Sequence, residues 1–137
     1  MSSLKPFWKI TIHIPVIESL RSTEFNRFAE EVSRKIQPIL RKITSIPGVG
    51  VVGNYDEIYE LDLGFEGFRP RKGASPHYGR IGEGIELPKA AITTYVERPC
   101  RESVLAELID AVKSVHPWEH PMIEFIECFL YVPTGPV

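Results

Sequence analysis

The chain has 137 residues, 43% of them hydrophobic, and its two cysteines are far apart and outside any CxxC motif. This length fits one domain, 1–137, that buries enough apolar surface to fold without disulfides or a structural metal. The net charge of −2 argues against binding nucleic acid through many phosphate contacts, and no apolar stretch reaches membrane-spanning or signal-peptide length. We therefore expect a cytoplasmic protein without a nucleic-acid or membrane partner.

The first elements follow from two different periodicities. Residues 8–14 alternate apolar and polar side chains, which is typical of a strand with one buried face. Over residues 25–43, apolar side chains recur at spacings of three and four, which predicts a long amphipathic helix capped by Ser22 or Thr23. Pro38 should kink or split this helix, because proline lacks the backbone N–H that a helix interior needs.

The second half of the chain repeats the order of strand and helix. Apolar and acidic residues alternate over 51–63, which predicts a second strand, and a Gly-rich loop follows over 64–84. A third strand is predicted over 85–97, and a helix with an apolar stripe over 104–115. The final strand, 122–132, carries apolar residues on both of its faces.

The order β-α-β-β-α-β predicts an α+β fold of the ferredoxin-like type, in which two helices pack on one face of a four-stranded antiparallel sheet. An extended first helix and the Gly-rich loop between the second and third strands decorate this two-layer sandwich. Because the helices cover one sheet face only, apolar residues on the other face need a cover. A homo-oligomer would supply it; the alternative is that the Gly-rich loop folds back over that face.

Four short motifs resemble a known family. They are GVGVVGNY at 48–55, GFRPRKGASP at 67–76, GRIG at 79–82 and HPWEHP at 116–121. In this order and spacing they resemble the accessory domain inserted in NIF3-like proteins, and the CutA divalent-cation-tolerance proteins share that fold and a similar HPYE-containing segment. CutA proteins resemble PII signalling proteins and form trimers, so the resemblance implies a CutA/PII-like fold and a trimer or dimer. It implies no hydrolase activity, because NIF3-like proteins carry their dinuclear metal site on flanking domains.

The HPWEHP motif is a candidate metal site. His116, Glu119 and His120 offer the nitrogen and oxygen ligands that suit zinc or copper. The alternative is a structural turn, in which His116 caps the preceding helix and Glu119 accepts hydrogen bonds from backbone N–H groups.

The Gly-rich loop and the neighbouring motifs are candidates for binding an organic ligand. Glycine backbones allow close approach to an anion, and we expect ligand contacts at five residues of these motifs. They are Asn54, Tyr55, Arg69, Arg80 and Trp118. The alternative is that the loop is an ordered contact between subunits.

The sequence thus predicts a NIF3-accessory-like oligomeric module that binds a small ligand, a metal ion or a protein partner in a regulatory or scaffolding role. A small enzyme of the isomerase or cyclase type is the alternative. It would have a pocket between subunits and use His77, His116 and Glu119 as acid–base groups, because imidazoles titrate near neutral pH. A lone surface histidine is the simpler interpretation of His77.

Overall fold

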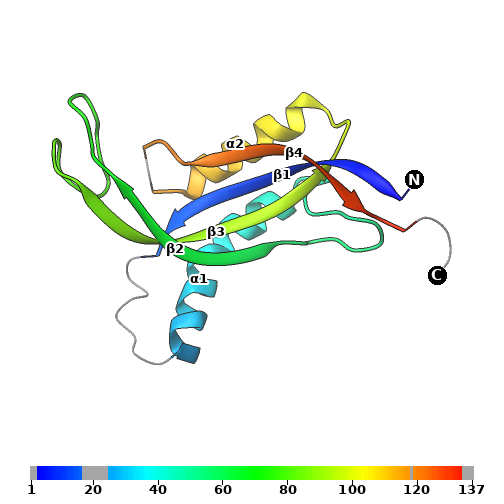
Figure 1. The fold of residues 1–137 in the computed structure, drawn as a ribbon, viewed down its shortest axis with the longest axis horizontal. Helices are drawn as coiled ribbons and strands as arrows, with labels where there is room; N and C mark the ends of the chain where they lie inside the picture. Colours follow the sequence, from blue (N-terminus) through cyan, green and yellow to red (C-terminus); the bar gives the residue numbers. More distant parts are fainter. Residues whose placement is uncertain (1–2, 17–24, 118, 134–137) are drawn as a thin grey trace.

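The computed structural model describes residues 3–16, 25–117 and 119–133, so the cap predicted at Ser22 or Thr23 lies outside the described residues. Six elements follow one another in these ranges: β1 (Leu4–Pro15), α1 (Phe25–Thr44), β2 (Glu60–Phe68), β3 (Ile85–Glu97), α2 (Glu102–Val115) and β4 (Ile123–Tyr131). The strand order is β2-β3-β1-β4 and each neighbouring pair is antiparallel, which is the ferredoxin-like topology. Both helices lie on one face of the sheet (Figure 1), which confirms the predicted α+β fold.

The main core lies between the sheet and the helices. Ile10, Ile12 and Ile14 alternate along β1 and are buried against the apolar stripes of both helices. On the helix side, Ile36 of α1 and Leu108 of α2 are almost fully buried. Full burial of one such side chain contributes roughly 1.5–3 kcal/mol, so this layer is a main source of stability. Within the described ranges, neither helix combines the length and the apolar character needed to cross a membrane.

The first helix is continuous from Phe25 to Thr44 although Pro38 lies inside it. Pro38 is predicted to kink or split the helix, and the split is wrong. Proline removes one hydrogen bond within the helix, but Ile36 and Ile39 on either side of it are buried in the core. Their packing holds both halves of the helix against the same sheet.

The second strand begins later than the sequence pattern predicts. β2 starts at Glu60 rather than Val51, and residues 49–58 form a loop. Gly50 has a φ of +77°, and its N–H donates to the carbonyl oxygen of Tyr95 at 2.8 Å, so the chain turns there. The alternating pattern in this stretch therefore belongs to a loop whose apolar side chains pack on the sheet.

This loop covers one end of the sheet face that points away from the helices, which we call the open face. Val52 and Ile58 of the loop pack against a second, smaller core that Phe7, Tyr95 and Val132 form. Residues 49–58, and not the Gly-rich loop, therefore cover this end of the open face.

Candidate functional site

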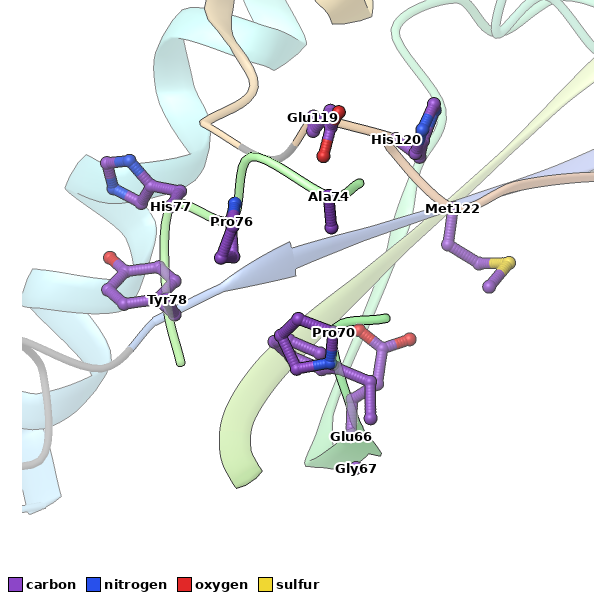
Figure 2. Close-up of a pocket in the computed structure, with 11 residues that line it drawn as sticks. Glu66, Gly67, Pro70, Ala74, Pro76, His77, Tyr78, Glu119, His120 and Met122 are labelled. Carbon is purple, nitrogen blue, oxygen red and sulfur yellow. The ribbon is translucent and has the colours of Figure 1, made fainter. Parts of the chain in front are cut away.

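A small pocket lies where the hairpin loop between β2 and β3 meets the connection between α2 and β4 (Figure 2). We call it the hairpin pocket, and its volume is about 250 Å³. Its apolar wall contains Phe68, Pro70, Ala74, Pro76, Tyr78 and Met122. Its polar side chains are those of Glu66, His77, Glu119 and His120. The pocket thus unites the motifs at 67–76 and 116–121, which are far apart in the sequence.

The hairpin loop is ordered by its own backbone. The N–H of Gly82 donates to the carbonyl oxygen of Pro70 at 2.8 Å, which closes the loop across its base. Gly79 has a φ of +88°, and a Cβ atom there would lie 3.1 Å from the side chain of Ile85. Glycine permits both this conformation and this close approach. The Gly-rich sequence therefore specifies a folded wall of the pocket.

Glu119 connects the two walls. Its Oε2 accepts a hydrogen bond from the backbone N–H of Ser75 at 2.9 Å. Figure 2 shows this carboxylate directed toward the segment that contains Ala74. Hydrogen bonds to an ionised acceptor are stronger than those between neutral groups, so this contact helps to hold the hairpin in place. It is the type of contact that the structural-turn alternative predicts for Glu119.

Glu66 brings a second carboxylate to the pocket from the sheet. It lies on β2 opposite Leu87 of β3, and its side chain is half-buried. Within the described part of the chain, no hydrogen bond or ion pair engages this carboxylate. Lys89 follows on the same face of β3, but its Nζ is bonded to His13.

Three polar side chains form a row across the open face beside the pocket. Lys89 Nζ lies 2.5 Å from His13 Nδ1, and His13 Nε2 lies 2.6 Å from Glu124 Oε1. An ammonium group can only donate, so His13 Nδ1 accepts and the neutral ring carries its proton on Nε2. His13 adjoins the pocket, because its backbone N–H donates to the carbonyl oxygen of Met122 at 3.1 Å. The row links β3, β1 and β4 where the pocket begins.

His116 is buried and lies outside the hairpin pocket. Its Nε2–H donates to the backbone carbonyl oxygen of His13, and its backbone N–H donates to that of Val112 at 2.8 Å. His116 thereby ends α2 and ties it to β1, as the structural-turn alternative predicts. Burial lowers the pKa of the His116 imidazole, the hydrogen bond to His13 partly opposes this change, and the nearby His13 ring adds to it.

The predicted acid–base groups do not assemble in this chain. His77 and Glu119 both line the pocket, whereas His116 does not. The His77 ring packs edge-on against Tyr78, with 4.5 Å between the ring centroids. Figure 2 shows His77 apart from Glu119 and His120, with its ring directed away from both.

The predicted metal ligands do not converge either. Glu119 and His120 line the pocket, but the His116 Nε2–H is bonded to the carbonyl oxygen of His13. Within residues 3–16, 25–117 and 119–133, no three His, Cys, Asp or Glu side chains form a group that could hold a metal ion.

Four of the five residues predicted to contact an organic ligand are described, and none of these four lines the pocket. Asn54 and Tyr55 are exposed in the loop 49–58. Arg69 and Arg80 are exposed on the hairpin and do not line its pocket. Trp118 lies outside the described residues.

No protein-family model matches the chain, and no curated protein matches it at a significant level. Among solved structures, a Bacillus cereus protein related to NIF3 is similar over 91% of this chain, with a TM-score of 0.62 and 16% sequence identity. The two share the fold. This chain corresponds to only 26% of the NIF3-related chain, about a quarter of its length.

CutA proteins are also similar, at lower scores. CutA1 from Pyrococcus horikoshii has a TM-score of 0.42 and 18% identity, over 88% of this chain and 82% of that one. The periplasmic divalent cation tolerance protein CutA from Archaeoglobus fulgidus has a TM-score of 0.43 and 16% identity, over 95% and 87%. At this identity the NIF3-related structure bears on the fold alone, and the function has to be argued from the site.

Sequence reasoning misses two residues that define the pocket. The predicted second strand ends at Leu63, but β2 continues to Phe68. Glu66 and Phe68 are two residues apart and therefore point to the same face of the strand. The alternation of side chains continues beyond Leu63 and could have indicated the longer strand, but Gly64 and Gly67 made this stretch resemble a loop.

Proposed function

We propose that this protein is a regulatory or scaffolding module that binds a small ligand in the hairpin pocket. The observation that carries the proposal is the meeting of two distant motifs, 67–76 and 116–121, around one cavity. Small-molecule sites are typically concave and mostly apolar, with a few polar groups that orient the ligand. The apolar wall and the carboxylates of Glu66 and Glu119 match this description.

The size of the pocket limits the ligand. Its volume of about 250 Å³ lies just below the range of roughly 300–1,000 Å³ that is usual for drug-sized ligands. A cavity of about 150 Å³ is enough to hold benzene. A single ring with a short side arm therefore fits inside the pocket, and a nucleotide is too large to be enclosed by it.

We also propose that the module is a homo-oligomer, a dimer or a trimer. Leu63 and Phe65 on β2 are 51% and 65% exposed, although Ala90, which pairs with Leu63 on β3, is fully buried. The helices thus cover β3 but do not cover the edge strand β2, whose side chains on the same sheet face stay exposed. An open edge with apolar side chains favours pairing with another chain, and a second copy is the partner we propose.

An NMR titration of ¹⁵N-labelled protein with single-ring compounds of different charge tests the small-ligand proposal. We expect the largest shift changes at residues 66–78 and 119–122. Ala74→Phe should fill the pocket and weaken binding by roughly tenfold or more, because the half-buried Ala74 lines it. Ile81→Phe is the matched control, because Ile81 is exposed on the same hairpin outside the lining. The proposal fails if no compound binds at millimolar concentration, or if the shifts cluster elsewhere.

A further inference from the structure

We propose that the ligand of the hairpin pocket is a small organic cation, a protonated amine carried on an apolar body about the size of one ring. This inference rests on the proposed function, because it names the chemical class of ligand for the same site. Its basis is the charge of the lining. Among the described residues that line the pocket, Glu66 and Glu119 are carboxylates, His77 and His120 are imidazoles, and none is a lysine or arginine.

The cations of the hairpin do not offset this charge. Arg69, Arg71, Lys72 and Arg80 are all exposed, and none of them lines the pocket. The sequence alone suggests an anion site on this hairpin, because four cations lie close together in the chain. The folded hairpin instead separates the two charges, with carboxylates at the cavity and cations on the outer surface.

Glu66 is the group that most needs a cationic partner. Half-burial removes part of the water around its carboxylate, which costs free energy unless a hydrogen-bond donor replaces that water. No such donor engages Glu66 in the described part of the chain. Lys89, the cation that follows on the same face of β3, is held 2.5 Å from His13. An ammonium group of a ligand would supply the missing charge-assisted hydrogen bond.

Glu119 and the aromatic residues can complete the site. Glu119 uses Oε2 to accept the N–H of Ser75, and no contact within the described residues occupies Oε1. Phe68 and Tyr78 place aromatic rings in the same wall, and ring faces attract cations within about 6 Å. The remaining wall, with Pro70, Pro76 and Met122, suits the apolar body.

Three probes of nearly equal shape separate the alternatives. Calorimetric titration at pH 7 and low salt compares benzylamine, a cation, with the neutral benzyl alcohol and the anionic benzoate. We expect benzylamine to bind roughly tenfold or more tightly than benzyl alcohol, because hydrogen bonds to charged groups are the stronger ones. Benzoate should bind most weakly, because two carboxylates repel it. Added salt should weaken the binding of benzylamine and not that of the other two probes.

Charge-removing variants with unchanged shape assign the effect to a residue. Glu66→Gln should reduce the preference for benzylamine over benzyl alcohol to about threefold or less, because the amide carries no charge. Glu119→Gln keeps an oxygen for the Ser75 N–H and should also reduce the preference. Glu83→Gln is the control, because Glu83 is exposed on the same hairpin and does not line the pocket. Circular dichroism confirms that each variant is folded.

Two failures remain distinguishable. If benzyl alcohol or benzoate binds as tightly as benzylamine, or if folded Glu66→Gln and Glu119→Gln keep the full preference, the cation inference is overturned and the small-ligand function stands. If neither these probes nor the compounds of the NMR titration bind to the wild-type protein, the proposed function fails and the inference falls with it.

Discussion

The Nε2–H group of His116 donates a hydrogen bond to the backbone carbonyl oxygen of His13. The contact fastens the C-terminal end of α2 to β1, one of the two inner strands, and both histidines are buried. Burial opposes the charged form of an imidazole, so the pKa of His116 lies below its ordinary value. His116, which the sequence predicts as a metal ligand or an acid–base group, therefore connects α2 to β1.

Stability should fall as the pH drops below about 6.5, the ordinary pKa of histidine. In that range the unfolded chain binds a proton that folded His116 resists, so the free energy of unfolding decreases as the pH falls. His116→Gln can still donate to the carbonyl oxygen of His13 but does not titrate. Urea unfolding midpoints at about pH 7.5 and about pH 5.5 should therefore differ less for the variant than for the wild type. An equal loss in both proteins would contradict this role of His116.

The neutral His13 ring should carry its proton on Nε2, because Lys89 Nζ lies 2.5 Å from Nδ1 and can only donate. Long-range ¹H–¹⁵N correlation spectra above pH 7 report which nitrogen is protonated. We expect the Nε2–H form in the wild type and still in Lys89→Met, because Glu124 Oε1 accepts at Nε2; a mixture of tautomers should appear only when Lys89→Met is combined with Glu124→Ala. A wild-type spectrum of the Nδ1–H form would rule out the Lys89 contact.

Gly50→Ala should destabilise the fold by about 1–3 kcal/mol, since the new residue would be held at positive φ. The φ of Gly50 is +77°, and its Cβ would lie 3.2 Å from the backbone of Ile58. Gly84→Ala is the control, because no atom lies within 4 Å of its Cβ position. Thermal or urea unfolding should leave Gly84→Ala close to the wild type. Equal effects of the two substitutions would show that the loop 49–58 does not pack as described.

Light scattering should give a mass above that of the single 15.6 kDa chain. Leu63→Lys should shift the protein toward the monomer, because it places a charge on the exposed apolar edge of β2. Ile81→Lys changes an equally exposed apolar residue outside the strands and should leave the mass unchanged. A monodisperse wild-type monomer at micromolar concentration would end the oligomer proposal. A mass that corresponds to a dimer would exclude only the trimer and leave the oligomer proposal in place.

The melting temperature should be the same with and without a chelator, because the Nε2–H of His116 is already bonded to His13 and leaves Glu119 and His120 as a partial ligand set. Calorimetric melts and native mass spectrometry check this expectation. The free energy of unfolding of His120→Ala should also lie within about 0.5 kcal/mol of the wild-type value, as is usual for substitutions of exposed residues. If a chelator lowers the wild-type midpoint and His120→Ala removes that effect, the metal interpretation regains its support.

Periodicity alone predicts most of the fold. The bounds of β3 match the expected 85–97, because Gly84 and Pro99 flank the apolar run. α1 ends at Thr44, before the Pro47 and Gly48 that exclude a helix. The pattern fails at 51–63, where alternation also arises when a loop packs every second side chain on a sheet. Contacts such as that of Gly50 with Tyr95, a residue far along the chain, separate the two cases.

The site is less predictable than the fold, because it depends on which side chains the hairpin turns inward. The sequence singles out Arg69 and Arg80 for their charge, but both lie outside the pocket lining. Glu66 carries no motif signal, and its importance follows from the register that sets it opposite Leu87. Glu119 and Ser75 both lie in motifs, but the motifs do not indicate that these two residues pair. Long-range pairing, which local patterns do not encode, decides these roles.

Because β1 lies between β3 and β4, the first of these four strands to be synthesised gains its second neighbour last. Such pairings between distant residues are slow to form, since the intervening chain must be ordered first. A nascent chain that ends before Ile123 leaves one whole edge of β1 unpaired, including the backbone of Ile10 and Ile12. Apolar open edges of this kind join with other chains. Interrupted synthesis should therefore yield fragments that aggregate or occupy chaperones, even though the finished domain covers the same strand on both sides.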